Sequence, residues 1–284
     1  MRTSIKDYLL SFPFYFLPHH LISRLMLKLS RIENLAAKNF IIRSYTKLIS
    51  VDMSEAVEED RYAYKSLNEF FTRELKPECR PFDEDPQAWL CPVDGAISQA
   101  MPIQDGRIFQ AKGLDYSLLE LVGGDEDIAK QFTHGHFSTI YLSPRDYHRI
   151  HMPITGKLKK MSYIPGRLFS VADHTVNAIP RLFTRNERCV CYFEAESGPM
   201  ALILVGAINV SAIETVWHGI VTTEGKKINR FNYDDNAVVL QRGEEMGRFN
   251  LGSTVIVLAT DKFNFDRAIT AKAPVKLGQR LGGF

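Results

Sequence analysis

The sequence predicts an α+β protein in which helices at the N-terminus precede a mostly antiparallel β body. Three observations predict this fold class. Apolar residues recur at helical spacing within residues 1–50, a Pro-rich charged stretch follows at KPECRPFDEDPQ, and short β-type runs begin at Trp89. Gly and Pro separate those runs at short intervals, which is typical of antiparallel sheets. A chain of 284 residues, 45% of them hydrophobic, can bury one substantial core or two small ones.

The first element, the apolar segment YLLSFPFYFLPHHLISRLMLKL, predicts helix that lies on a membrane surface. Pro13, Pro18 and Arg24 interrupt it before the ~20 apolar residues that a spanning helix needs, and no signal-cleavage site follows it. Beyond Pro18, which suits a helix start, one face is apolar and another is basic: Leu21, Ile22, Leu25 and Leu29 against Arg24, Lys28 and Arg31. The alternative is a helix that packs on its own domain.

The charge distribution also favours an anionic partner surface. Residues 1–50 contain eight Lys or Arg and two acidic residues, so this segment carries +6 although the whole chain carries only +2. A basic front end on a mildly acidic body is typical of contact with an anionic membrane. We therefore divide the chain into a basic amphipathic helical membrane-association segment, residues 1–50, and a β-rich domain, residues 51–284.

Further elements follow in order. The stretch SLNEFFTREL predicts a helix, because Ser66 and Glu69 have the spacing of a capping box. The predicted strands lie in the runs FSTIYLS, CVCYFEAE, ALILVGAINVSAIETVW, AVVLQ and TVIVLAT. No internal repeat or basic-aromatic array is evident, so we expect no nucleic-acid partner.

The four cysteines predict reduced thiols in a cytosolic compartment. No C-x-x-C pair occurs among Cys79, Cys91, Cys189 and Cys191. Nothing in their spacing resembles a disulfide framework, which secreted domains of this kind would use.

Two segments concentrate side chains that can carry chemistry. CPVDGAIS contains Asp94 before a glycine, although Asp-Gly is also a common turn dipeptide. LSPRDYHRIHMP contains His148 and His151, which can act as acid-base groups or remain structural neighbours. With the HGH sequence at residues 134–136 they could in principle bind a metal, but no ordered ligand set completes a site, so we expect no metal.

The stretch GRFNLGSTVIVL places Gly252-Ser253 directly before a run typical of a buried strand. Glycine tolerates tight backbone geometry, and the serine hydroxyl lies within reach of the preceding carbonyl. The pair is therefore a turn or a reactive peptide bond. Ser253 lacks the G-x-S-x-G elbow of many hydrolases, yet a triad of Asp94, His151 and Ser253 assembled by the fold remains possible.

Together these motifs resemble the phosphatidylserine decarboxylases. LGST at residues 251–254 is similar to that family's self-cleavage motif, SPRDYHRIHMP to its histidine motif, and PVDGAIS to its aspartate motif. The similarity continues through NEFF, AKGLDYSL, PGRLFSV, RNER, GPMALILVGA and ETVW, so it covers most of the chain from Ser66 onward. Residues 1–50 match the family only in character. The resemblance implies a barrel-sandwich-like body.

The resemblance also implies that the chain is a proenzyme cut between Gly252 and Ser253. In this family the serine hydroxyl attacks the preceding carbonyl to form an ester, β-elimination leaves dehydroalanine, and hydrolysis with loss of ammonia leaves a pyruvoyl group. The products here would be a β chain, residues 1–252, and an α chain, residues 253–284. His151 would deprotonate Ser253, Asp94 would orient and charge-stabilise His151, and His148 would return a proton after decarboxylation.

The implied activity is conversion of phosphatidylserine to phosphatidylethanolamine and CO2. The pyruvoyl ketone forms a Schiff base with the substrate amine and acts as an electron sink. We expect a peripheral membrane enzyme on the cytoplasmic face of a bacterial inner membrane; a homo-oligomer is possible, and Arg145 and Arg149 are candidate headgroup contacts on charge alone. The alternatives are a membrane-associated serine hydrolase that uses the Asp94/His151/Ser253 triad and an inactive lipid-binding module.

Overall fold

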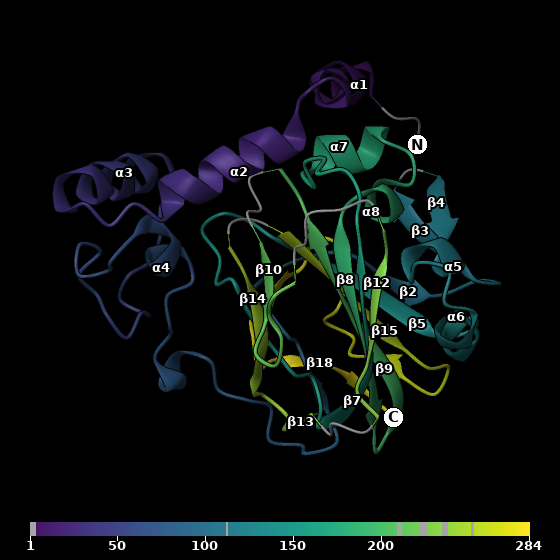
Figure 1. Cartoon of the computed structure of the whole chain (residues 1–284). Helices are drawn as coiled ribbons and strands as arrows, with labels where there is room; N and C mark the ends of the chain where they lie inside the picture. Colours follow the sequence, from purple (N-terminus) through teal and green to yellow (C-terminus); the bar gives the residue numbers. More distant parts are fainter. Residues whose placement is uncertain (1–3, 112, 209–211, 222–226, 235–237, 251–252) are drawn as a thin grey trace.

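The structure, a computed structural model, describes residues 4–111, 113–208, 212–221, 227–234, 238–250 and 253–284 (Figure 1). Helices gather at the N-terminal side of the molecule, and the remainder is dominated by β-sheet. All named strand pairs are antiparallel. The predicted α+β class with a mostly antiparallel body is therefore confirmed.

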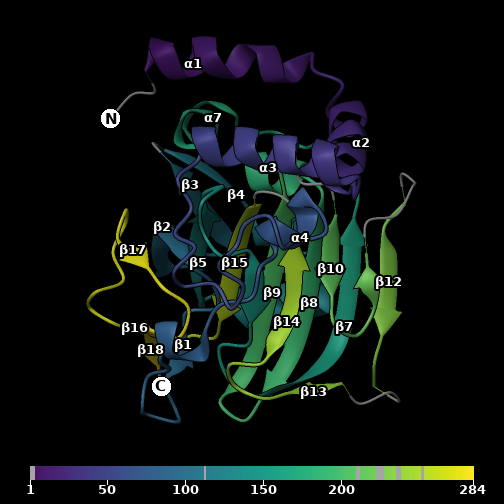
Figure 2. The ribbon, with the colours of Figure 1, turned by 90° about the vertical axis from the view of Figure 1, so that its left-hand side faces the viewer.

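The N-terminal segment forms four short helices that lie over one end of the sheets (Figure 2). They are α1 (Ile5–Ser11), η1 (Phe12–Tyr15), α2 (His19–Ser30) and α3 (Leu35–Leu48). Pro18 is the N-cap of α2, as its sequence position predicts, and the Asn34 side chain caps α3 by accepting from the Ala37 backbone N–H. Within the described residues, none of the helices has the length and apolar character needed to cross a membrane.

Helix α4 (Leu67–Phe71) begins with the predicted capping interaction. The Ser66 hydroxyl accepts from the backbone N–H of Glu69, while the Glu69 carboxylate accepts from the N–H of Lys65. The helix is shorter than the stretch SLNEFFTREL predicts. It ends at Phe71, with Thr72 as its C-cap, and it buries Phe70 and Phe71. A 3-10 turn, η2 (Pro77–Cys79), follows in the Pro-rich stretch.

A nine-stranded sheet forms the centre of the body, in the order β12-β7-β8-β9-β15-β5-β2-β17 with β13 also paired to β7. Its strands are β2 (Gly95–Pro102), β5 (His136–Leu142), β7 (Gly156–Ile164), β8 (Arg188–Ala195), β9 (Gly198–Gly206), β12 (Asn229–Asn232), β13 (Val239–Leu240), β15 (Ser253–Ala259) and β17 (Pro274–Val275). All seven residues of β15 are buried, since it lies between β5 and β9, which explains its continuous apolar run.

Smaller elements complete the body. A four-stranded sheet has the order β11 (Gly219–Ile220), β10 (Ile213–Thr215), β14 (Glu245–Phe249) and β6 (Arg149–His151). A three-stranded sheet has the order β1 (Trp89–Leu90), β18 (Arg280–Gly283) and β16 (Asn264–Phe265). A hairpin of β3 (Arg107–Ala111) and β4 (Leu114–Ser117) and the helices α5 (Leu118–Leu121), α6 (Glu126–Phe132), α7 (Asp173–Ala178) and α8 (Leu182–Arg185) cover the rest.

The sheets share one hydrophobic core, but the described strands do not close into a barrel. Ile150, Ile213 and Phe249 of the four-stranded sheet belong to the same buried cluster as the central strands, so the two sheets pack together as in a sandwich. Among the described residues β12 and β17 are the edges of the largest sheet and do not pair with each other. The barrel part of the expectation is therefore corrected to open, packed sheets.

The RNER motif has a structural explanation in Arg188, which is 3% exposed. Its guanidinium donates to the backbone carbonyls of Glu120, Leu121, Thr184 and Asn186. Burial lowers its pKa to about 10, so the side chain is charged at neutral pH. Arginine here ties α5 and α8 to the start of β8.

We expect Arg188→Met to lower the free energy of unfolding by about 3 kcal/mol or more, because several buried carbonyls lose their donors. Arg188→Lys should recover part of this loss, since an ammonium donates to fewer carbonyls in a fixed plane. Urea unfolding followed by tryptophan fluorescence measures the effect. Wild-type stability of Arg188→Met would contradict this role.

Candidate active site

The strand register brings Ser253 and Asp94 to the same end of the central sheet. Ser253 is the first residue of β15, and it lies opposite Leu142 of β5 and Gly206 of β9. Asp94 immediately precedes β2, the other neighbour of β5, where Ala96 pairs with Tyr141. Only β5 therefore separates these two candidate residues in the sheet.

The histidine motif, which follows β5 in the chain, lies at the same end of the central sheet as Ser253 and Asp94. The His151 backbone N–H donates to the carbonyl of Pro92 at 2.9 Å, which ties β6 to the segment before Asp94. The carbonyl of His148 accepts from the N–H of Phe249 at 3.0 Å, at the end of β14 and four residues before Ser253. The tertiary structure thus gathers all three predicted motifs.

Asp94 is buried and ionised, and its partners are cationic. The Arg80 guanidinium donates to both carboxylate oxygens, with Nε–Oδ1 at 2.9 Å and Nη2–Oδ2 at 2.5 Å. Lys276 Nζ lies 3.3 Å from Oδ2, and the Leu277 N–H donates to Oδ1 at 2.9 Å. Burial alone would raise the pKa of Asp94, but these hydrogen bonds and charges outweigh it and lower the pKa below 3.8.

His151 is oriented by a backbone carbonyl instead of by Asp94. Its Nδ1 donates to the carbonyl of Gly243 at 2.8 Å, which fixes the tautomer, so Nε2 keeps its lone pair and accepts from the Tyr147 hydroxyl at 3.1 Å. Burial lowers the pKa of His151, while the charges of Glu245 and Asp94 act in the opposite direction. Asp94 therefore influences His151 through its charge and not through a hydrogen bond.

His148 is fully buried against an aromatic ring. Its Nδ1 donates to the Asp146 carbonyl at 2.8 Å, and its ring centroid lies 4.0 Å from that of Phe71. Nε2 has no hydrogen-bond partner among the described residues. Burial lowers the pKa of His148 to about 3, so the imidazole is neutral with an available lone pair on Nε2.

Ser253 carries an unsatisfied buried hydroxyl. The residue is 1% exposed, and its Oγ has no partner within the described part of the chain. The hydroxyls of Ser138, Thr139 and Thr254 share this property, so Ser253 is distinguished by its place beside the aspartate and histidine motifs. Gly252, the other half of the expected cleavage site, lies outside the described residues. Conversion of Ser253 to a ketone would remove the unsatisfied donor, so the site fits a pyruvoyl group.

The other residues that the sequence suggested for the site either lie away from Ser253 or already bind partners inside the protein. Arg149 donates to the Thr72 carbonyl and to Glu245, so its charge is neutralised inside the protein, whereas the side chain of Arg145 is exposed. His136 begins β5 at the end opposite Leu142, far from Ser253. In the described ranges, no cluster of three or more His, Cys, Asp or Glu could hold a metal.

Sequence reasoning missed Arg80, which it placed in a linker. A single arginine in a Pro-rich charged stretch gives no pattern that points to a buried ion pair, and only the fold brings it to Asp94. It also missed Tyr147 as the partner of His151, although SPRDYHRIHMP contains both residues at a spacing of four.

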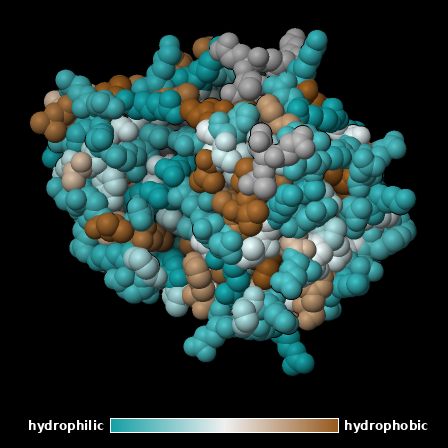
Figure 3. Space-filling model, turned by 60° about the horizontal axis from the view of Figure 1, so that its bottom comes forward, coloured by the Kyte–Doolittle hydropathy of each residue, from teal (hydrophilic) through white to brown (hydrophobic). Residues whose placement is uncertain are grey.

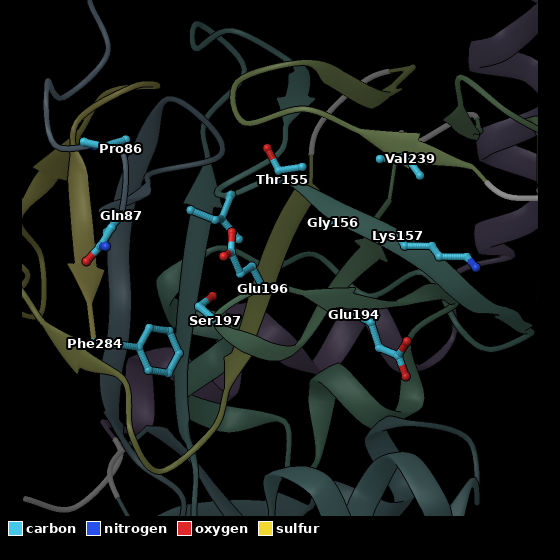
Figure 4. A pocket seen from close by; sticks show the side chains of 11 residues that line it. Pro86, Gln87, Thr155, Gly156, Lys157, Glu194, Glu196, Ser197, Val239 and Phe284 are labelled. Atoms are coloured by element: carbon cyan, nitrogen blue, oxygen red, sulfur yellow. The ribbon is translucent and has the colours of Figure 1, made fainter.

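A cavity of about 570 Å³ lies at the other end of the sheet (Figure 4). Gln87, Ser197 and Phe284 are among its lining residues. Strand β9 runs from Gly198 beside this cavity to Gly206 opposite Ser253, a distance of about 25 Å at the usual rise per residue. The cavity is therefore separate from the candidate active site.

Known protein families and curated relatives match nearly the whole chain. The family model described as phosphatidylserine decarboxylase matches residues 67–283, and one described as PSD matches residues 9–48. Three similar proteins bear the name phosphatidylserine decarboxylase proenzyme. That of Alkalilimnicola ehrlichii is 55% identical over 258 residues, or 90% of each chain. That of Bordetella pertussis is 51% identical over 280 residues, covering 97% of this chain and 94% of the relative. That of Pseudomonas aeruginosa is 50% identical over 282 residues, or 98% of each chain.

Proposed function

The chain belongs to the phosphatidylserine decarboxylase family, and on that premise we propose that it cuts itself before Ser253 and then converts phosphatidylserine to phosphatidylethanolamine and CO2. One observation carries the proposal: the buried hydroxyl of Ser253, which has no partner among the described residues, begins the central strand at the point where the aspartate and histidine motifs converge. A serine hydroxyl becomes an effective nucleophile when a neighbouring general base accepts its proton, and His151 of the histidine motif is the candidate for that base.

In self-cleavage, His151 is the base and Ser253 the nucleophile. His151 Nε2 takes the hydroxyl proton, Oγ attacks the carbonyl carbon of residue 252, and the proton passes to the Ser253 nitrogen as the carbon–nitrogen bond breaks. The fixed Nδ1 proton leaves Nε2 as the basic atom, and its bond from Tyr147 must be exchanged for one from Ser253. Elimination of the ester and hydrolysis with loss of ammonia then leave a pyruvoyl group at residue 253.

When formed, the pyruvoyl group supplies a ketone for the substrate amine and an electron sink for the carbon that loses CO2. His148 is the candidate for handling the proton that this carbon must regain, since its Nε2 has no partner within the described ranges and can take up and return a proton. The smaller chain stays in place after the cut, because every residue of β15 pairs with both β5 and β9. Its strand β18 also pairs with β1 of the larger chain.

Intact-mass spectra of the denatured protein, with and without borohydride, test this proposal together with an assay of phosphatidylethanolamine formation. We expect two chains, residues 1–252 and 253–284, with a reducible carbonyl on the smaller one. A single chain labelled at Ser253 by a fluorophosphonate would favour the serine hydrolase instead. A single unlabelled chain without activity would favour an inactive lipid-binding module.

We also propose that the N-terminal helices hold the active site at an anionic membrane, on the cytoplasmic face of a bacterial inner membrane. Among the described residues, thirteen of the 21 exposed large hydrophobic side chains lie between Ile5 and Leu48. The face away from these helices is largely hydrophilic with scattered hydrophobic patches (Figure 3). Exposed apolar and basic side chains together favour interfacial binding. The four free cysteines support a reducing compartment.

Helix α3 of this segment and helix α4, which follows it in the chain, contact the active-site end of the sheet. Tyr45 of α3 donates to the carbonyl of Pro144, just beyond β5, and Asn68 of α4 donates to Asn250 near the cleavage site. A membrane bound by these helices would therefore lie beside the site, which suits a lipid substrate.

We expect the triple variant Leu21→Ser, Leu25→Ser, Leu29→Ser to lose most of its binding to anionic liposomes, because each half-exposed leucine contributes on the order of 1 kcal/mol of apolar transfer. Co-sedimentation measures binding. Deletion of residues 1–31 is less informative, since His19 packs on Phe169 of the body. The control replaces three exposed apolar residues elsewhere by serine: Val216, Ile220 and Val239. Unchanged binding of the leucine variant would contradict this membrane role.

A further inference from the structure

We propose that Arg80 is a positioning residue for self-cleavage, which acts by holding Asp94 as a fixed, ionised carboxylate beside the histidine motif. This inference rests on the proposed function and adds a residue to it. Arg80 lies in the Pro-rich stretch before the β body, outside all the motifs that carry the family resemblance.

The guanidinium of Arg80 is buried between two carboxylates. Its side chain is 6% exposed. One edge binds Asp94 through Nε and Nη2, and Nη1 and Nη2 bind the Glu55 oxygens at 3.0 and 2.6 Å. Planar arginine can satisfy both partners at once, which a lysine ammonium does with less geometric control.

The other partners of Asp94 cannot replace Arg80. The Lys276 side chain is 52% exposed and makes one contact of 3.3 Å, and Leu277 contributes only a backbone N–H. Asp94 itself is 2% exposed. Without Arg80, the buried carboxylate of Asp94 would keep only the solvent-screened cation of Lys276. A buried carboxylate with so weak a partner rotates away or takes up a proton.

The state of Asp94 matters because its negative charge favours the protonated form of His151, which must exist briefly during the cut. The carboxylate also connects the two future chains, since Lys276 and Leu277 belong to residues 253–284. The other charged or titratable groups around Asp94 and Arg80 include Glu55, Lys276, Arg73, Cys91, Tyr147, His148 and His151.

The test follows the rate of self-cleavage from pH 5 to 9 in full-length chains pulse-labelled by cell-free translation. We expect Arg80→Gln to slow the cut at least tenfold at pH 7. The midpoint of its acid limb should rise by about one pH unit, because Asp94 loses its main cation. Arg80→Lys should recover part of the rate. Lys276→Gln, which removes the weaker and more exposed cation, should slow the cut less than Arg80→Gln does.

A wild-type rate and pH profile in Arg80→Gln would overturn the inference. A slower cut with an unchanged midpoint would also overturn it, because it would indicate only a structural role. Resistance to limited proteolysis shows whether each variant is folded. If Arg80→Gln is not folded, the Arg80→Lys variant is used in its place. A wild-type rate of self-cleavage in Arg80→Lys would also contradict the inference. An uncut wild-type chain would instead count against the proposed function itself.

Discussion

Replacing Ser253 by alanine should leave one uncut chain of 284 residues and abolish formation of phosphatidylethanolamine. Alanine has no oxygen to attack the carbonyl of residue 252, and without the cut no ketone forms at residue 253. Loss of processing and loss of activity are therefore expected together. Denaturing intact-mass spectra and a decarboxylation assay on the same preparation measure both effects.

Ser138→Ala is the matched control for this experiment. Ser138 is also fully buried, its hydroxyl also has no partner among the described residues, and it lies on the adjacent strand opposite Val257. It should be cut normally. His151→Ala keeps the nucleophile but removes the base, so its cleavage should be slower by roughly 10²–10⁴-fold. Two chains divided before residue 253 in Ser253→Ala would refute the assignment of the nucleophile.

Replacing His148 by glutamine should separate the two chemical steps. We expect the chain to be cut, because His148 is not the proposed base for Ser253. Phosphatidylethanolamine formation should fall by roughly 10²–10⁴-fold. Glutamine can preserve a hydrogen bond to the Asp146 carbonyl but cannot accept and return a proton at the substrate carbon. The ratio of cut chain to activity, measured on one preparation, gives the result.

His136→Gln serves as the control for this second experiment, since His136 lies at the opposite end of β5. It should retain both cleavage and activity. A cut, fully active His148→Gln protein would make His148 a structural neighbour of His151. A His148→Gln chain that folds but is not cut would move its role to the processing step.

Several elements could be predicted from the sequence because they depend on local patterns. Pro18 starts α2, Ser66 caps α4, and the apolar run TVIVLAT is a buried strand. The β3–β4 hairpin and the short helices α5 to α8 were not predicted, and of the described residues in the run AVVLQ only Val239 and Leu240 form a strand. The barrel part of the barrel-sandwich-like body that the family resemblance implied was wrong, because the described strands form open, packed sheets. Sheet closure depends on which distant edges pair, and sequence periodicity does not report this.

The candidate site shows the same division. The residue types and their spacing alone left a turn, structural histidines or a hydrolase triad open. The resemblance of three motifs to the phosphatidylserine decarboxylases pointed to Asp94, His148, His151 and Ser253. Their local partners could not be selected in this way. Gly243 orients His151 from a segment 92 residues away, and Phe71 covers His148 from a helix before the β body.

The sequence by itself thus determined which residue types are available for chemistry, where helices and strands form, and to which family the motifs point. Only the tertiary structure decided that Arg80 holds Asp94 and that Tyr147 occupies the basic nitrogen of His151. It also decided that the hydroxyl of Ser253 is buried, with no partner in the part of the chain that the structure describes. The physical reason is that hydrogen bonding, burial and the pKa shifts they cause depend on contacts between distant segments, and short-range sequence patterns do not encode those contacts.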